Sequence, residues 1–273
     1  IDSDGWRDIT DMRKALIKMD PTDEHHASVL DLAWIEYIVL STPISCAADY
    51  WTCSWSDLIF ITRLLVAHAC GMRACEHDHG CRLADIVSAH CTGSSTGLAG
   101  HVTFRVAGRV DGPADGVHRA RKLKSSPARL CGLPIWDSHI SAGSALIALA
   151  YRVHGIGVNK DWQKHVSTTV LFPTTRGPDD VAGAPQSSRQ FMARVRAVLR
   201  NIGMPAAVLA GITGHSLRAG AATDYLEMNL PESFVRTQCG WAGESLRIYH
   251  RPQERHRWSA SRRVFAAMQT AGF

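Results

Sequence analysis

The segment from Ser56 to Cys70 constrains the fold of this chain more than any other. Its apolar residues recur at helical spacing on one face: Leu58, Ile61, Leu65 and Ala69. Ser56 is a suitable N-cap and Gly71 a suitable C-cap. The apolar run is shorter than the roughly 20 residues that a membrane span requires. The segment therefore predicts an amphipathic helix of a water-soluble domain, and we expect no membrane partner.

Similar patterns predict further helices on both sides of a segment with a different character. The helices are expected over residues 6–19, 26–40, 141–153, 188–202, 215–227, 231–239 and 258–270. Between 85 and 135, Val102 to Val106 alternates and is rich in β-branched residues, and a second extended segment runs through Lys124 towards Ile135. We therefore predict an α+β fold that is mainly helical, with a small antiparallel β-sheet inserted among the helices.

The composition is that of a globular chain with a modest positive charge. The 273 residues carry a formal charge of +5, and 45% of them are hydrophobic, which argues against extended disorder. Basic residues gather in two stretches, from Arg105 to Arg129 and from Arg251 to Arg263. Such clusters suit a polyanionic partner, although a solvated basic surface has the same composition.

The eight cysteines show no disulfide framework, which favours a reducing, intracellular location. Four alternating residues, Cys75, His77, His79 and Cys81, contain the atoms that zinc prefers. Their spacing fits none of the usual zinc patterns, because no second Cys or His pair lies nearby. We therefore expect neither a metal site nor a cofactor.

The segment from Gly214 to Thr223 carries the most informative chemistry. His215 and Arg218 are three residues apart, so a helix places them on one face. A proton-transfer group beside a permanent cation suits a phosphoryl centre, whose oxygens gain negative charge in the transition state. The His-x-x-Arg pattern alone is nevertheless common in surface helices.

Four further motifs accompany this segment in a fixed order. Gly71-Met72-Arg73-Ala74-Cys75-Glu76 follows the first strong helix, and Arg121-Lys122-Leu123-Lys124 lies in the predicted sheet. Gly240-Trp241 and Tyr249 follow His215 and Arg218. Together these motifs resemble the tyrosine recombinases (the phage-integrase superfamily) over about residues 21–252. The sequence His-Ser-Leu-Arg-Ala-Gly-Ala-Ala-Thr, with Trp241 where many members have His, is similar to that of the recombinases of eukaryotic mobile elements of the DIRS and Crypton kinds.

The resemblance implies a role for each matching residue in cutting double-stranded DNA. Arg73 and Arg218 clamp the scissile phosphate, since guanidinium groups bind phosphate oxygens in pairs. Tyr249 attacks the phosphate and forms a 3′-phosphotyrosyl bond without a metal ion. The remaining implied roles are orientation of Arg73 by Glu76, proton transfer by His215, and hydrogen-bond donation to phosphate by Trp241.

Two lysines of the predicted sheet are candidates for the general acid that protonates the leaving 5′-oxygen. Lys124 fits the family hairpin better, and Lys122 lies two residues away on the same face of a strand. The neighbouring basic residues Arg119, Arg121 and Arg251, with Lys122, are expected to contact the DNA backbone.

The resemblance also implies a domain organisation and a set of partners. Residues 1–25 are expected to be a linker or the remnant of an upstream DNA-binding domain, and 26–273 the catalytic domain. Its tail helix, 258–273, packs on a neighbouring protomer or on its own core. The expected assembly is a homotetramer on DNA, in the nucleus if the source is eukaryotic. Two alternatives are type IB topoisomerase-like DNA relaxation and a catalytically silent, domesticated DNA-binding protein.

Overall fold

The computed structural model describes residues 28–78, 81–94, 97–106, 128–154, 170–173, 186–204, 206–241 and 246. The helices in this part of the chain are α2 (Leu32–Leu40), α3 (Trp55–Ala69), α4 (Ala74–Asp78), α5 (Ala142–His154), α6 (Ser188–Asn201), α7 (Ala206–Ala210), α8 (Ser216–Glu227) and α9 (Glu232–Cys239), with short 3-10 turns η1 (Ala47–Trp51) and η2 (Leu83–Asp85). The strands are β1 (Ile86–Ser94), β2 (Gly97–Val106) and β3 (Arg129–Ile135). The predicted fold class is confirmed: the structure is mainly helical with one small antiparallel sheet.

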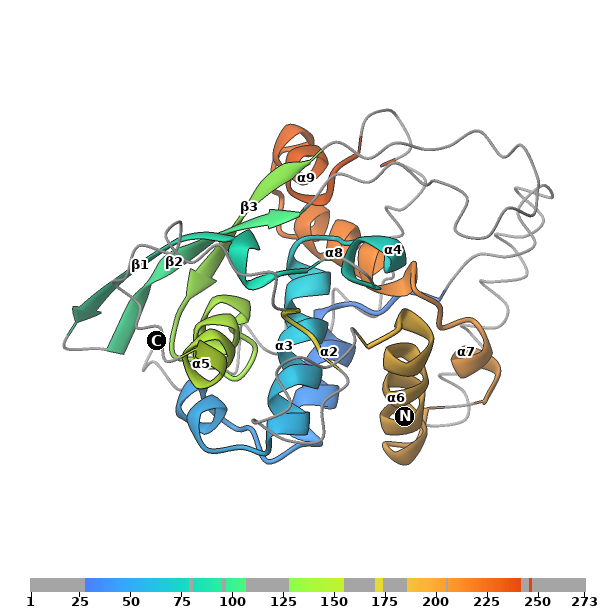
Figure 1. The fold of residues 1–273 in the computed structure, drawn as a ribbon. Coiled ribbons are helices and arrows are strands. Elements are labelled where there is room, and N and C mark those ends of the chain that lie inside the picture. Colours follow the sequence, from blue (N-terminus) through green and yellow to red (C-terminus); the bar gives the residue numbers. More distant parts are fainter. Residues whose placement is uncertain are drawn as a thin grey trace, which may run out of the picture.

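Helix α3 runs through the middle of the fold, with the sheet and α5 on one side and α6 on the other (Figure 1). Its N-cap is Ser54, whose side chain accepts a hydrogen bond from the backbone of Asp57, so the expected cap at Ser56 is wrong by two residues. Most of α3 is buried, including its polar residues Thr62 and Arg63. Neighbours on several sides therefore replace the single buried face that the sequence pattern predicts.

The sheet has the strand order β1-β2-β3, and both pairs are antiparallel. Residues of β3 alternate between buried and exposed, and the buried set packs towards α5. The predicted strand over Val102–Val106 is confirmed as the second half of β2, while β1 is an addition to the prediction. Glycine, serine and histidine in β1 interrupt the alternating apolar pattern that identifies a strand from sequence.

The helices predicted over 141–153, 188–202, 215–227 and 231–239 are confirmed to within one residue. The helix predicted over 26–40 begins only at Leu32, because Asp31 is its N-cap and accepts a bond from the backbone of Trp34. The helices expected over 6–19 and 258–270 lie outside the described residues. None of the described helices is long and apolar enough to cross a membrane.

Helix α8 lies against the segment that precedes α2. The backbone N–H of Leu30 donates to the carbonyl of Ser216 at 3.1 Å, and that of Leu32 donates to the Asp224 carboxylate at 2.7 Å. Gly220 faces Leu30 so closely that a Cβ atom there would overlap the Leu30 carbonyl group. The glycine therefore permits the backbone contact that holds α8 in place.

We expect Gly220→Ala to lower the free energy of unfolding by about 2–3 kcal/mol, because the added methyl group meets backbone that cannot move aside. Gly132 on β3 is the matched control, since a Cβ atom there meets nothing within 4 Å. Gly132→Ala should change stability by less than about 0.5 kcal/mol. Urea unfolding of both variants tests this, and equal midpoints would contradict the close contact.

Candidate functional site

Two helices, α3 and α9, end side by side. Gly71 follows the C-cap of α3 with φ +51°, and Gly240 is the C-cap of α9 with φ +69°. A Cβ atom on Gly71 would overlap the side chain of Cys239, so a glycine is needed there. The last carbonyl groups of a helix lack partners within the helix and carry partial negative charge. Two sets of such carbonyls therefore meet at one place.

Arg218, in the first turn of α8, binds carbonyls from both helix ends. Its Nη1 donates to the carbonyls of Gly71, at 2.6 Å, and Cys239, and its Nη2 donates to that of Gly240 at 3.2 Å. The guanidinium carbon lies 3.9 Å from the centre of the Trp241 ring, and Arg218 is only 1% exposed. Arg218 thus joins α3, α8 and α9 in a single contact.

The pKa of Arg218 is lowered to about 10. Burial is the main cause, and the positive charge of Arg73 lowers the pKa further, against an opposing effect of Glu76. The group remains protonated at neutral pH. Arg218 donates to the carbonyl of Gly71, two residues before Arg73, so the two arginines belong to one region of the fold.

Arg129, at the start of β3, is a second buried cation in the same place. Its Nη1 and Nη2 donate to the two carboxylate oxygens of Glu76 at 3.0 and 3.1 Å. The Nη2 also donates to the carbonyl of Cys70, and Nε donates to that of Gln238. Burial opposes the charge of Arg129, but the hydrogen bonds and negative charge of Glu76 raise its pKa above the ordinary value.

The interior position of Arg129 corrects one expectation from the sequence. The basic stretch from Arg105 to Arg129 suits a polyanion or a solvated surface, yet Arg129 is only 8% exposed and is bound to protein groups. A signal for burial was available, because Arg129 is in phase with Cys131, Leu133 and Ile135 on the buried face of β3. The basic residues around Arg129 predict an exposed position, whereas the alternating pattern of β3 predicts the buried position that the structure shows.

Arg73 and Glu76 lie where the chain leaves α3 and enters α4. The backbone N–H of Arg73 donates to Glu76 Oε2 at 2.8 Å, and its Nη1 donates to Oε1 at 3.2 Å. The Glu76 side chain is fully buried, whereas that of Arg73 is 27% exposed. Glu76 therefore binds an interior arginine, Arg129, and a partly exposed one, Arg73, at the same time.

His215 is exposed at the N-cap position of α8, one turn before Arg218. Its backbone N–H donates to the hydroxyl of Thr213. A Cβ atom on the preceding Gly214 would lie 2.5 Å from that of Ala74, so this turn packs against the residue that follows Arg73. The fold thereby brings His215 to the same region as the two arginines.

The structure therefore gathers one part of the predicted site and does not describe the other. The described candidates in this region are Arg73, Glu76, His215, Arg218 and Trp241, with Arg129 added to them. The remaining candidates lie outside the described residues: Arg119, Arg121, Lys122, Lys124, Tyr249 and Arg251. Tyr225, a described tyrosine of α8, is partly buried, and its hydroxyl donates to the carbonyl of Ala69.

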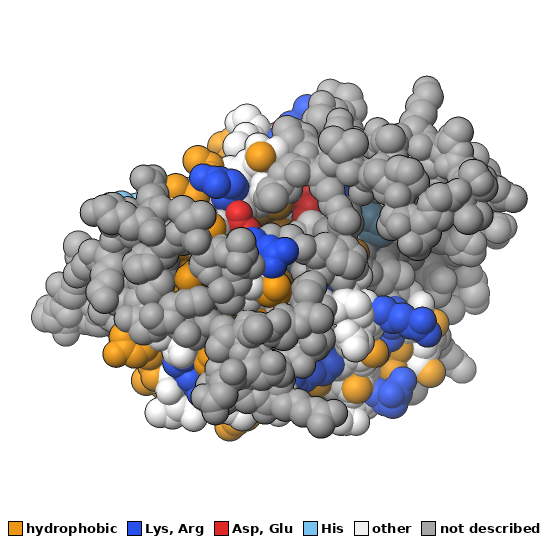
Figure 2. Space-filling view, in the orientation of Figure 1, with side chains coloured by type: hydrophobic (Ala, Val, Ile, Leu, Met, Phe, Trp, Pro, Cys, Tyr) orange, Lys and Arg blue, Asp and Glu red, His pale blue; other side chains and the backbone are white. Residues whose placement is uncertain are grey.

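The described site contains more positive than negative side chains. Three of its groups are guanidinium ions and one is a carboxylate, although the helix ends add partial negative charge. In Figure 2, Lys or Arg and Asp or Glu side chains lie next to one another near the middle of the face shown. An excess of guanidinium groups with one fork partly exposed is suited to binding an oxyanion such as a phosphate.

Of the four alternating Cys and His residues, His79 and the side chain of Cys75 lie outside the description, and among the described residues no group of three potential metal ligands occurs. Buried Arg63 donates to His77 Nδ1 from Nε at 3.1 Å, and its Nη2 lies 2.8 Å from the same atom. The His77 ring therefore accepts at Nδ1 and is neutral. Cys81 is buried as well, and burial raises its pKa to about 12.

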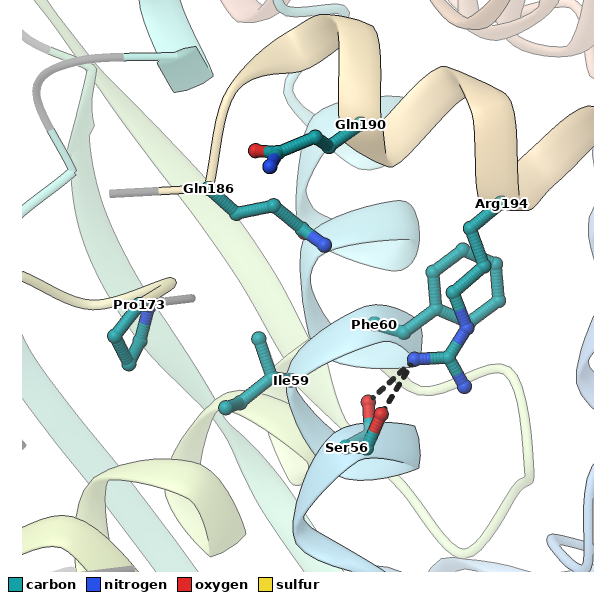
Figure 3. Close-up of a pocket in the computed structure, with 7 residues that line it drawn as sticks. All are labelled: Ser56, Ile59, Phe60, Pro173, Gln186, Gln190 and Arg194. Atoms are coloured by element: carbon teal, nitrogen blue, oxygen red, sulfur yellow. Dashed lines mark hydrogen bonds between the residues drawn. The ribbon is translucent and has the colours of Figure 1, made fainter. Parts of the chain in front are cut away.

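A pocket of about 220 Å³ lies at the opposite end of α3 (Figure 3). It forms where the N-terminal part of α3 meets that of α6, and its lining residues are Ser56, Ile59, Phe60, Pro173, Gln186, Gln190 and Arg194. Arg194 is held there by Ser56, by an ion pair with Asp57 at 2.6 Å, and by the Phe60 ring. None of the predicted site residues that the structure describes lines this pocket.

Comparisons with known proteins give matches among solved structures alone. No protein-family profile and no curated protein sequence matches the chain. The chain is similar to XerA recombinase at 16% identity and a TM-score of 0.46, over 90% of this chain and 66% of that one. It is similar to XerH site-specific recombinase in a post-cleavage complex with palindromic difH substrate, at 16% identity and a TM-score of 0.45, over 86% of this chain and 53% of that one. It thus spans less than two thirds of the length of these solved chains.

We expect acid to destabilise the fold through His77. Burial, with a further contribution from the charge of Arg63, lowers the pKa of His77 from 6.5 to about 3. Between these values the unfolded chain binds a proton that the folded chain excludes. Stability therefore falls as the pH falls below 6.5, by up to about 1.4 kcal/mol per pH unit.

The test compares urea unfolding at pH 7 and pH 5 for the wild type and for His77→Gln, which keeps an acceptor for Arg63. The wild type should lose about 2 kcal/mol more than the variant over this interval. An equal loss in both proteins would show that His77 does not exclude the proton.

Proposed function

We propose that this chain is the catalytic domain of a tyrosine recombinase that cuts and rejoins duplex DNA. The observation that carries the proposal is the gathering of Arg73, Arg218 and His215 at the paired ends of α3 and α9. Arg73 is more than 140 positions away from His215 and Arg218 in the sequence, and the three residues follow the order of the family motifs. The excess of guanidinium groups provides the positive charge that a phosphoryl transition state requires.

The two arginines differ in how they meet the phosphate. Arg73 is partly exposed, so its fork is accessible to non-bridging oxygens. Arg218 lies deeper, and its bonds to Gly71, Cys239 and Gly240 account for three of its five N–H groups. Arg218 then acts as a fixed charge at the base of the site, while Arg73 binds at its surface.

Cleavage is a phosphoryl transfer in which no net phosphodiester energy is lost. The Tyr249 oxygen forms a bond to phosphorus as the bond to the 5′-oxygen breaks, which gives a 3′-phosphotyrosyl intermediate. The 5′-oxygen takes a proton from Lys124, and the tyrosine proton passes to a base, for which His215 is the candidate. Rejoining reverses these steps without ATP. Guanidinium groups stabilise the charge, so the proposed reaction needs no metal ion.

Trp241 packs against Arg218. Its ring stacks on the guanidinium group of Arg218, which fixes the plane of the fork. It is 7% exposed and packs among apolar residues of α8 and α9, so it has a structural role as well. We propose that its indole N–H donates to a phosphate oxygen once DNA is bound.

The wider assignment follows the family. We propose residues 1–25 as a linker or upstream remnant and 26–273 as the catalytic domain, which acts as a homotetramer in contact with DNA through Arg119, Arg121, Lys122 and Arg251. A DIRS or Crypton origin and a nuclear location belong to the same proposal. A type IB topoisomerase uses similar residues, and relaxation of supercoiled DNA without pairing of two sites distinguishes it.

One observation favours a second candidate, a DNA-binding protein without catalysis. Arg218 is 1% exposed and binds three carbonyl groups, which an arginine with a purely structural role also does. In that case the site has kept its fold and lost its chemistry. Covalent capture of DNA separates the two candidates.

We expect the protein to form a covalent adduct with nicked duplex DNA in the presence of EDTA. The substrate is a pool of nicked duplexes with randomised sequence. After cleavage the short fragment with the 5′-hydroxyl diffuses away, so the strand cannot be rejoined and the adduct accumulates. A denaturing gel detects the adduct. Tyr249→Phe should abolish the adduct, because the phenyl ring has no nucleophile. Tyr151→Phe is the matched control, since it removes a hydroxyl from an exposed tyrosine that packs on Trp51.

Binding of DNA without any adduct would support the silent DNA-binding candidate. An adduct that persists in Tyr249→Phe would assign the nucleophile to another residue. An adduct that requires a divalent metal ion would contradict the proposed charge stabilisation by arginine.

We expect Lys124→Ala to slow cleavage of the captured sequence by about 100-fold or more, because the 5′-oxygen then leaves without a proton. A substrate with sulfur in place of that bridging oxygen should restore the rate, since a thiolate leaves unprotonated. Lys122→Ala is the control: it weakens DNA binding, but at saturating DNA it should show neither effect on the cleavage rate. Restoration in Lys122→Ala instead would transfer the role of general acid to Lys122.

A further inference from the structure

We propose that Arg129 is a positioning residue that fixes the orientation of Arg73 through Glu76. The inference deepens the proposed function and rests on it, because Arg73 is a phosphate-binding group only in that reaction. The family resemblance implies no role for Arg129, and its basic surroundings in the sequence suit either a polyanionic partner or a solvated surface. Its position in the interior points to a different task.

The first step is the pairing of Arg129 with Glu76. Both Nη atoms of Arg129 meet both oxygens of the carboxylate, at 3.0 and 3.1 Å. The two side chains are 6% and 0% exposed, so water screens the pair weakly. A buried carboxylate held at both oxygens by a planar fork has one orientation.

The second step runs from Glu76 to Arg73. The same two oxygens accept the backbone N–H and the Nη1 of Arg73. One bond fixes the turn that precedes α4, and the other restrains the long, partly exposed side chain of Arg73. The direction of that side chain therefore depends on how Arg129 holds the carboxylate.

The third step relates Arg129 to Arg218. Arg129 binds the carbonyls of Cys70 and Gln238, and Arg218 binds those of the next residues, Gly71 and Cys239. The two arginines thus lie on consecutive peptide groups at both helix ends. Arg129 consequently sets the position of Arg73 relative to the same backbone that holds Arg218.

A lysine cannot replace Arg129 in this role. Its ammonium group is a point charge and cannot meet two carboxylate oxygens and two carbonyls with one planar fork. Arg129→Lys therefore keeps the positive charge and removes the geometry. Arg194→Lys is the matched control, because Arg194 also has an ion pair, with Asp57, and a stacked ring, Phe60, but lies at the other end of α3.

The first measurement is the single-turnover rate of adduct formation at saturating DNA, in a double-mutant cycle. Arg129→Lys should slow cleavage about 10- to 100-fold, because a small misplacement of a phosphate-binding group is costly. In an Arg73→Ala background the same change should alter the rate less than about twofold. Arg194→Lys should remain within about twofold of the wild type. Equal slowing in both backgrounds would overturn the inference.

The second measurement needs no DNA and follows Arg73 itself. Phenylglyoxal modifies accessible arginines, and peptide mass spectrometry gives the rate at Arg73. This rate should rise several-fold in Arg129→Lys and stay unchanged in Arg194→Lys. An unchanged rate in Arg129→Lys would overturn the inference whether or not the protein cuts DNA, while a wild type without any adduct would overturn the proposed function alone.

A second variant, which retains Arg129, keeps the inference testable if Arg129→Lys does not fold. If Arg129→Lys does not unfold cooperatively in urea, Glu76→Gln interrupts the same chain of contacts at its middle and keeps the side-chain size. It should slow cleavage only when Arg73 is present and should raise the phenylglyoxal rate at Arg73. Neither effect in a folded Glu76→Gln protein would overturn the inference.

Discussion

The structure depends on two buried arginines that bind the free carbonyl groups at the C-terminal ends of α3 and α9. Arg129 and Arg218 bind adjacent carbonyls at each end: those of Cys70 and Gly71, just after α3, and those of Gln238, Cys239 and Gly240, where α9 ends. An unsatisfied buried polar group costs about 1–3 kcal/mol, so helix ends could not meet here without such donors. The sheet, α8 and the site residues are all placed by this contact, because the arginines come from β3 and α8.

The same contact limits which residues the neighbourhood accepts. Gly71 and Gly240 have positive φ values, and a Cβ atom on either would meet Cys239 or Arg129. Cys239 is completely buried, and burial raises its pKa to about 12. A neutral thiol fills the space between the helix ends and leaves the charge of the arginines in place. Small, uncharged residues are therefore required between the two helix ends, at positions 71, 239 and 240.

The three arginines of the site differ in solvent exposure, and this difference separates those that stabilise the fold from the one proposed to bind phosphate at the surface. Arg129 and Arg218 are buried and bound to the protein, whereas Arg73 is partly exposed and restrained by Glu76. A site that must bind and release a polyanion gains from one accessible cation on a rigid base, since little reorganisation is needed on binding. The single negative charge of Glu76 is shared between Arg129 and Arg73.

The sequence by itself determined the mainly helical fold, the small sheet and the positions of several helices to within one residue, because their apolar periodicity is local. It also determined the order of the His-x-x-Arg, Arg-x-x-Glu and Trp motifs that the resemblance rests on. It did not determine β1, which lacks an alternating pattern, or the N-cap of α3. Only the tertiary structure decided that Arg129 belongs to the site and that Arg218 binds carbonyls of two helices. The reason is physical: burial of a charged side chain depends on partners that are about 20 to 150 positions away in the sequence, and no local pattern records them.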